Sequence, residues 1–383
     1  MKIPFNRPSI TKREIAEVVA TLESGWITTG PRTRKFEEEF ASYCGAKHAV
    51  AVNSCTAAMH LGLSAMNLQP GDEVITSPYT FAASAEVILY HGARPVFVDI
   101  TPETFNIDPE QIEKSITEKT RVLLPVHIAG LPSAMDKIIE LAEKYELKVL
   151  EDAAHATETM YHNRKVGSIS NATAFSFYAT KNLATGEGGM LTTNDDRIAE
   201  RARILSLHGM SRDAWKRYHS GGSWQYEIVA QGYKYNMTDI QAALGLVQLS
   251  RLEEMGRKRK SIVDRFNKAF SELPQLMVPP DSSLHRHAWH LYLLRIKPEL
   301  MTIDRDRFIE LLQESGISPS VHFIPLHLMP LYQKEWGYQA GDFPKAEAIF
   351  NSEITLPLYP DLAEDEVDFI IDRVFDIVSQ NRK

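Results

Sequence analysis

The stretch Lys148–Ala156 reads KVLEDAAHA, an apolar β-rich run (Lys148–Glu151) that ends at an acidic residue followed by small residues. Similar apolar runs lie on both sides of it between residues 48 and 194, and amphipathic segments separate them. These other runs are His48–Asn53, Glu73–Ser77, Pro95–Asp99, Arg121–His127, Ala172–Phe177 and Met190–Thr193. The alternation predicts an α/β fold with a mainly parallel seven-stranded sheet between helices.

Polar turns follow some of these predicted strands. In a parallel sheet covered on both faces, ligands bind beyond the carboxyl ends of the strands. Three strands lead into chemically active turns, which are Asn53–Thr56 (NSCT), Glu151–His155 (EDAAH) and Phe177–Lys181 (FYATK). We therefore expect a site assembled from pieces that are distant in sequence.

The length of the chain predicts more than one domain. Its 383 residues exceed the roughly 250 to 300 at which single cores stop growing. We expect a large α/β domain over residues 1–250, which includes the N-terminal segment, and a smaller α+β domain over residues 251–383. A helix from about Asp239 to Leu273 leads to the junction and bridges it, and a Pro-rich cluster at 279–282 follows. Further on, we expect β-like runs at Ala288–Ile296 and Ser320–Phe323, and helices at Arg305–Ser315 and Glu364–Ser379.

The composition argues against several classes of protein. Asp and Glu number 50 against 42 Lys and Arg, a formal net charge of -8, which disfavours nucleic acid and anionic membranes as partners. We find no signal peptide and no membrane-spanning apolar run, so we expect the cytoplasm. Cys44 and Cys55 are too few for a disulfide framework, and we expect both to be reduced. The histidines His285, His287 and His290 have no carboxylate or thiolate at ligand spacing, so no metal site is predicted.

Lys181 lies between the apolar FSFY and the Gly-rich GEGGM, where its amine would project into a partly dry pocket. A Schiff-base lysine needs that environment, because its amine must lose a proton easily. A lysine at a strand end is more often a solvated charge, so this interpretation depends on Asp152. A carboxylate there could keep a pyridine nitrogen protonated, as pyridoxal phosphate requires, although Asp152 could also cap the following turn.

The segment Ser54–Ala58 lies between a predicted strand and a helix, where backbone N–H groups could bind a phosphate. Its Ser and Thr could equally be simple N-caps. Ser176 could add a hydroxyl to the same phosphate or be a buried hydroxyl bonded to the backbone. Phe81 could stack on a planar ring or be a core residue. The glycines after Lys181 do not follow a first strand, so they predict a tight turn and not a dinucleotide fingerprint.

Ligand contacts are also predicted elsewhere. His155 and His322 are candidates, and the segment Ser211–Gln231, which contains Trp224 and Tyr226, resembles a long binding loop.

Several motifs, in this order and spacing, resemble the DegT-type family of nucleotide-sugar aminotransferases over nearly the whole chain. They are WITTGP (26–31), EDAAHA (151–156), FSFYATKN (175–182), GEGGM (186–190) and GYKYNMTDIQAALG (232–245). The resemblance implies an aspartate-aminotransferase-like fold (fold type I), pyridoxal 5′-phosphate as cofactor, and a homodimer with active sites at the subunit interface. It also implies a ping-pong reaction in which glutamate donates the amine.

The resemblance carries roles onto individual positions. Lys181 matches the catalytic Schiff-base lysine and Asp152 the pyridinium partner. The other cofactor positions are Thr56, Ala57 and Ser176 for the phosphate, Phe81 for ring stacking, His155 near the phenolic oxygen, where many relatives carry Gln, and Asn236, which reaches the phosphate from the neighbouring subunit. For the substrate we expect contacts from Thr29, Tyr178, Trp224, Tyr226 and His322.

The predicted function is transfer of the glutamate amino group to a keto group, at C4, of a nucleotide-linked deoxy sugar for amino-sugar and polysaccharide biosynthesis. Amination at C3 is one alternative. A second is a sugar dehydratase or other pyridoxal-phosphate enzyme, although dehydratase relatives lack the lysine. A third is a non-catalytic cofactor-binding regulator. A Rossmann oxidoreductase is disfavoured because no G-x-G-x-x-G follows the first strand.

Overall fold

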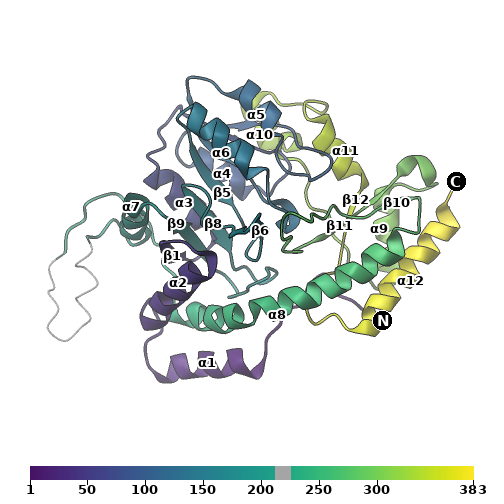
Figure 1. Cartoon of the computed structure of the whole chain (residues 1–383), viewed down its shortest axis with the longest axis horizontal. Helices are drawn as coiled ribbons and strands as arrows, with labels where there is room; N and C mark the ends of the chain where they lie inside the picture. Colours follow the sequence, from purple (N-terminus) through teal and green to yellow (C-terminus); the bar gives the residue numbers. More distant parts are fainter. Residues whose placement is uncertain (212–225) are drawn as a thin grey trace.

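The structure is a computed structural model that describes residues 1–211 and 226–383 (Figure 1). Its main sheet has seven strands in the order β1-β9-β8-β5-β4-β2-β3. Their bounds are β1 His48–Val52, β2 Glu73–Thr76, β3 Arg94–Phe97, β4 Thr120–Leu124, β5 Lys148–Asp152, β8 Ala172–Ser176 and β9 Gly189–Thr193. β9 is antiparallel to both of its neighbours, whereas the remaining pairs are parallel. The predicted α/β class and mainly parallel sheet are confirmed.

Helices surround this sheet and continue beyond it. Their bounds are α1 Lys12–Glu23, α2 Pro31–Cys44, α3 Cys55–Ala65, α4 Ala83–Leu89, α5 Pro109–Ser115, α6 Met135–Lys144, α7 Asp196–Ser206, α8 Asp239–Phe270, α9 Arg305–Glu314, α10 Pro330–Trp336, α11 Pro344–Ser352 and α12 Glu364–Asn381. Short 3-10 turns lie at Ile128–Gly130, Pro298–Leu300 and Leu326–Leu328. Within the described ranges, no helix is both long and apolar enough to span a bilayer.

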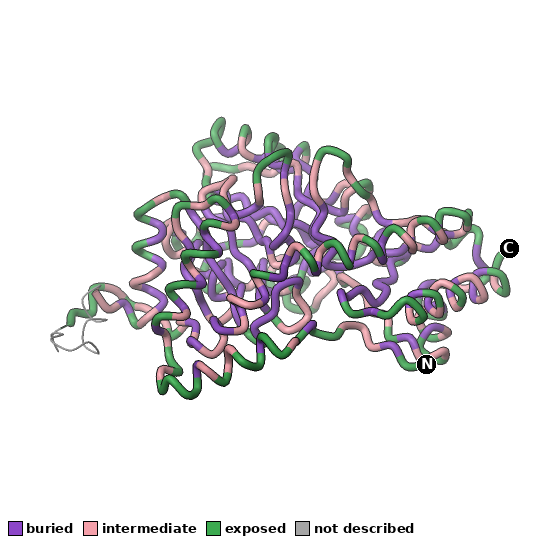
Figure 2. Tube along the Cα trace, turned by 60° about the horizontal axis from the view of Figure 1, so that its bottom comes forward, coloured by how far each residue is buried: buried purple, intermediate pink, exposed green. Residues whose placement is uncertain are grey.

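Both faces of the sheet are buried, as the alternation along β1 illustrates. Val50 and Val52 pack into the core that contains α3, α4 and α7. Ala49 and Ala51 lie on the other face, in a core with α2 and α8. Because successive strand residues point to opposite faces, an apolar run without polar alternation requires helices on both sides. Figure 2 shows buried segments of the chain at the centre of the molecule.

A second sheet lies beyond α8. Its three strands, β10 Leu276–Met277, β11 Tyr292–Ile296 and β12 Glu353–Leu356, pair antiparallel in the order β10-β11-β12. Phe266 and Phe270 of α8 pack in the core of this part of the chain. The expected junction between residues 250 and 251 therefore falls inside α8, which is one continuous helix (Figure 1). This helix packs in the core beside the main sheet and also in the core beside the second sheet. The division into two domains stays a prediction.

One predicted strand is wrong, and one hairpin was not predicted. The run Ser320–Phe323 forms only an isolated bridge between Ser320 and Thr355. Two residues further on, where a ladder would place its next donor on the same side, His322 N–H bonds to the Glu353 carboxylate, so the ladder does not continue. A small hairpin forms from β6 Met160–Tyr161 and β7 Arg164–Lys165.

Candidate active site

A cavity of about 380 Å³ lies at the carboxyl edge of the main sheet, a size suited to a small-molecule site. Its walls come from the turns after β1, β2, β5 and β8, from the N-terminal segment, and from residues beside the second sheet. The lining residues include Phe5, Ser54, Cys55, Thr56, Thr80, Phe81, Asp152, Ala154, His155, Ser176, Tyr178, Lys181, Glu187, His290, His322 and Phe323. The polar turns that the sequence singled out thus meet at one place.

Lys181 enters the cavity from the short turn that follows β8. Its backbone N–H bonds to Tyr178 O at 2.9 Å, and Thr185 N–H returns to Phe177 O at 2.8 Å, so the turn is tight. Burial lowers the pKa of the Lys181 amine to about 8, against the opposing effect of the Asp152 carboxylate. A much larger fraction of this amine is therefore unprotonated at neutral pH than of a solvated lysine, as a nucleophile requires.

Asp152 is the last residue of β5 and is buried. Its carboxylate accepts a hydrogen bond from the Ser84 hydroxyl at 2.7 Å and another from Ala154 N–H at 3.0 Å. These donors orient the carboxylate toward the cavity that Lys181 also lines.

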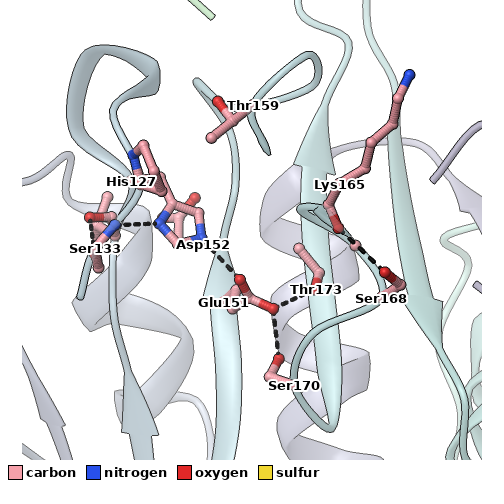
Figure 3. Close-up of polar contacts among 12 residues, drawn as sticks. His127, Ser133, Glu151, Asp152, Thr159, Lys165, Ser168, Ser170 and Thr173 are labelled. Carbon is pink, nitrogen blue, oxygen red and sulfur yellow. Dashed lines mark hydrogen bonds and ion pairs between the residues drawn. The ribbon is translucent and has the colours of Figure 1, made fainter. Parts of the chain in front are cut away.

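The neighbouring carboxylate points the other way. Glu151 accepts from His127 at 2.9 Å, Ser170 at 2.7 Å and Thr173 at 2.9 Å (Figure 3). As successive residues of a strand, Glu151 and Asp152 point to opposite faces of the sheet. Ser133 N–H donates to His127 Nδ1 at 3.0 Å, so the His127 hydrogen lies on Nε2 and is directed to Glu151. This buried network fixes the end of β5 that carries Asp152, and its side chains do not line the cavity.

The N-terminus of α3 forms another wall. Ser54 is its N-cap, and the Ser54 hydroxyl oxygen accepts from Ala57 N–H at 3.1 Å. A Cβ on Gly189 would lie 2.4 Å from the Ser54 carbonyl oxygen, so β9 approaches this turn only because it begins with glycine. The Thr56 and Ser176 side chains line the cavity beside the positive end of the helix, an arrangement that suits a phosphate.

His155 presents a fixed hydrogen-bond donor. Ala129 N–H donates to its Nδ1 at 3.2 Å, and burial lowers its pKa well below the usual value, so the ring is neutral and Nε2 carries the hydrogen. Gly130, with φ +98, permits the close packing, because a Cβ there would lie 2.8 Å from His155 O. The ring of Phe323 stacks on His155 with centroids 5.8 Å apart.

His322 is held by the second sheet. Its Nδ1 lies 2.9 Å from the Thr355 hydroxyl, which also bonds to Glu353 at 2.5 Å. Burial raises the pKa of the Glu353 carboxyl to about 8 and lowers the pKa of His322 to about 3, so the His322 imidazole is neutral. Phe5 stacks on the same ring at 5.4 Å, while Phe81 lines the cavity from the opposite loop and is 64% exposed.

Some predicted residues do not reach this cavity. Asn236 donates to the Thr29 hydroxyl at 2.6 Å, and neither residue is among the lining residues. The Ala57 side chain is buried, and its N–H serves the α3 cap. Tyr226 is exposed and lies outside the lining, and Trp224 falls outside the described residues.

Other cavity residues were not predicted. The sequence pattern offers His290 only as a metal ligand, yet it lies beside Lys181, with His290 Nε2 3.5 Å from Lys181 Nζ. A polar residue directly before the apolar run that becomes β11 was the signal available for it. Phe5 and Phe323 approach through tertiary packing, which no local pattern reveals. Across residues 1–211 and 226–383, no cluster of three or more His, Cys, Asp or Glu side chains could hold a metal ion.

The side chains around the cavity fit pyridoxal phosphate. They offer an amine for its aldehyde, a carboxylate for its ring nitrogen, a helix N-terminus with two hydroxyls for its phosphate, and Phe81 for one face of its ring. Two observations support this fit: Asp152 is a buried carboxylate, and Gly189 permits the close approach of β9 to the turn before α3.

Comparisons with known proteins agree with this chemistry. The chain matches the DegT/DnrJ/EryC1/StrS aminotransferase family over residues 8–375. It is 53% identical to the spore coat polysaccharide biosynthesis protein SpsC of Bacillus subtilis, over 98% of this chain and 97% of that protein.

Solved structures resemble it over their full length. The PMP-form of Spr1654 from Streptococcus pneumoniae is 39% identical, with a TM-score of 0.93 over 99% of this chain and 100% of that one. The PLP-form of the same protein gives a TM-score of 0.92 at 38% identity over 99% of each chain. Helicobacter pylori PseC, an aminotransferase involved in the biosynthesis of pseudoaminic acid, is 29% identical, with a TM-score of 0.92 over 99% of this chain and 100% of that one.

Proposed function

The chain belongs to the DegT/DnrJ/EryC1/StrS aminotransferase family and is a pyridoxal-phosphate-dependent sugar aminotransferase, and from this premise we propose that it moves the amino group of glutamate onto the C4 keto group of a nucleotide-linked deoxy sugar. The observation that carries the proposal is that Asp152, the last residue of β5, and Lys181, in the turn after β8, line one cavity. When bound, pyridoxal phosphate supplies an electron sink for the carbon that loses a proton.

Asp152 and the α3 terminus hold the cofactor at its two ends. The carboxylate of Asp152, oriented by Ser84, would keep the ring nitrogen protonated. Thr56 and Ser176 would bind the phosphate together with backbone N–H groups at the start of α3. Phe81 would cover the ring, and the Nε2–H of His155 would be available to the phenolic oxygen.

Lys181 performs two tasks in turn. Its amine, with a pKa lowered to about 8, would hold the cofactor through its aldehyde. When it is not engaged in that bond, Nζ would accept the proton from the α-carbon of glutamate and, in the second half of the reaction, give a proton to the sugar carbon. Lys181 thus serves both as covalent anchor and as general acid and base.

The keto sugar enters beside Tyr178 and His322. Tyr178 lines the cavity and is 46% exposed, so its hydroxyl remains available to a substrate. His322 also lines the cavity, and its neutral imidazole can form a hydrogen bond with a sugar hydroxyl. Contacts of Thr29, Trp224 and Tyr226 with the nucleotide sugar stay predictions, as does the cytoplasmic location.

A homodimer completes the site in this proposal. Asn236 lies outside the cavity of its own chain, so we assign its amide to the phosphate in the partner subunit. Helix α1 supports this arrangement because Ile15, Val19 and Leu22, spaced along one face, are 57%, 44% and 53% exposed. A second copy of the chain would bury that stripe.

The test is incubation with glutamate and a panel of 4-keto and 3-keto nucleotide sugars. We expect 2-oxoglutarate and an amino sugar whose NMR spectrum places nitrogen at C4, and Lys181→Ala should abolish both products. An amine at C3 would correct the position of transfer. Loss of water from the sugar, with no 2-oxoglutarate, would identify a dehydratase, and binding without turnover of any sugar would favour a regulator.

A further inference from the structure

A buried chain of hydrogen bonds leads away from the Lys181 amine. Lys181 Nζ lies 3.5 Å from His290 Nε2, and His290 Nδ1 lies 3.1 Å from Asn182 Oδ1. The Asn182 amide nitrogen donates to Glu158 and to Ala288 O, each at 2.8 Å. The site's reactive amine is therefore connected to groups outside the cavity.

These contacts fix the tautomer of His290. Both amide hydrogens of Asn182 are used by Glu158 and Ala288, so the amide oxygen must face His290. That oxygen can only accept, so His290 Nδ1 carries the hydrogen. Nε2 is left with its lone pair toward Lys181.

The series of hydrogen bonds ends at Glu158, which packs against α8. Arg286 donates to Glu158 at 3.2 Å, and the Arg259 guanidinium lies 3.9 Å from the same carboxylate. Helix α8 approaches Glu158 because residue 256 is glycine, where a Cβ would lie 1.9 Å from the carboxylate oxygen. The ion pairs hold Glu158 and, through Asn182, hold the imidazole.

We propose that His290 is a positioning residue for Lys181, whose amine donates a hydrogen bond to His290 Nε2 whenever it is not attached to the cofactor. The proposal rests on the function proposed above, in which Lys181 moves a proton between fixed carbon atoms. A long, flexible side chain can do this efficiently only if its amine returns to one place, because small displacements slow proton transfer strongly.

His290 acts as an acceptor and not as a proton store. Burial, together with the Lys181 charge, lowers the pKa of His290 well below its usual value, so the ring stays neutral. The other groups that face the amine are Asp152, Cys55, His155 and His322, and Glu187 also lines the cavity. A neutral acceptor stabilises an ammonium donor more than an amine, so its removal should lower the pKa of Lys181 further.

Two substitutions of His290 test the roles of its two ring nitrogens separately. His290→Gln can keep an acceptor near the Nε2 position, while His290→Asn keeps only the group that corresponds to Nδ1. His287→Asn is the matched control, because His287 is equally buried in the same segment and does not line the cavity.

The first readout is the capture of pyridoxal 5′-phosphate by Lys181 in the full-length, cofactor-free chain, trapped with borohydride across a pH series. We expect the pH midpoint to fall by about half a unit to one unit in His290→Asn and to stay near the wild-type value in His290→Gln and His287→Asn. The second readout is the half-reaction with glutamate, which should slow about tenfold in His290→Asn with little change in KM.

An unchanged midpoint in His290→Asn overturns the proposal, as does an equal loss in the Gln and Asn variants, which would indicate packing alone. If His290→Asn does not fold, Asn182→Ala replaces it, because it frees the imidazole; the midpoint must again fall, and an unchanged midpoint overturns the proposal. Neither readout requires a sugar, so failure of the sugar panel would count against the proposed substrate and leave this test intact.

Discussion

At the scale of single residues, Glu151 and Asp152 are neighbours on β5 whose carboxylates have separate surroundings. Glu151 lies in a buried network with His127, Ser170 and Thr173 (Figure 3). Asp152 instead lines the cavity. Each carboxylate is thus a matched control for the other, since the same substitution on the same strand tests different properties.

We expect Asp152→Asn to lower turnover by about 10²- to 10³-fold with little loss of stability, because an amide cannot keep the ring nitrogen protonated. Glu151→Gln should instead lower the free energy of unfolding by about 1 to 3 kcal/mol and leave most of the turnover intact. The amide nitrogen of glutamine cannot accept a hydrogen bond, so at least one of the buried donors to residue 151 loses its acceptor. Amine transfer from glutamate and chemical denaturation measure the two effects. The assignment fails if Glu151→Gln is the more damaging to turnover in folded protein.

The reactivity of Lys181 should depend on pH in a characteristic way. With a pKa of about 8, the unprotonated fraction rises about tenfold from pH 7 to pH 9. Cofactor capture by the cofactor-free chain should follow this rise and level off above pH 9. Stopped-flow absorbance measures it, and a rate still climbing beyond pH 10 would mean that the amine is solvated.

Sequence patterns predicted the cavity residues that lie at the end of a strand or just after it, since parallel strands bring their carboxyl ends to one edge of the sheet. Lys181, Asp152 and Thr56 all belong to this class. Phe5 and His290 do not, because they reach the cavity through the docking of the N-terminal segment and of the second sheet. The hydrogen position on His155 depends on a partner, Ala129 N–H, that only the folded chain supplies.

At the scale of elements, α1 is held by one buried carboxylate. Glu14 completes the capping box with Thr11 and accepts from Gln248 Nε2 at 2.8 Å and from Arg251, both on α8. Burial raises the pKa of Glu14, but the hydrogen bonds from Thr11 and Arg251 outweigh it and lower the pKa from 4.5 to about 2. A depressed pKa means that the ionised form stabilises the fold above pH 4.5 and that this stability is lost as the pH falls toward 2.

Glu14→Gln should therefore lower the free energy of unfolding by on the order of 2 kcal/mol at pH 7. The difference in the free energy of unfolding between this variant and the wild type should become smaller as the pH falls from 4.5 to 3. Urea denaturation at several pH values measures this, and Glu23→Gln, at the exposed end of the same helix, should have little effect at any pH. A gap that is the same at pH 3 and pH 7 would show that the charge of Glu14 is unimportant.

Element prediction succeeded where a pattern extended over several turns or strands. The strands of the main sheet and the long helices α8 and α12 were predicted within a few residues. The two-residue strands β6, β7 and β10 are too short to have a readable period, and β12 was not predicted either. The run Ser320–Phe323 has strand-like composition but gives its backbone donor to a carboxylate.

At the scale of the whole molecule, a shared site can be tested by mixing defective chains. Lys181→Ala and Asn236→Ala should each be nearly inactive alone, because each removes one group from every site. In a mixed dimer, one of the two sites regains both wild-type residues. An equimolar mixture allowed to exchange subunits should therefore recover about a quarter of the wild-type activity. No recovery despite proven exchange would place Asn236 in the site of its own chain.

Helix α8 runs unbroken for 32 residues, from the motif that contains Asn236 to the core of the second sheet. At 1.5 Å per residue it is a rod of about 48 Å, so a tilt of about five degrees at one end would displace the other by about 4 Å. Such a strut resists hinge bending between the two sheets. We therefore expect adjustment to sugars of different bulk to come from the loops at the cavity mouth, and exchanging those loops alone should be enough to re-engineer the choice of substrate.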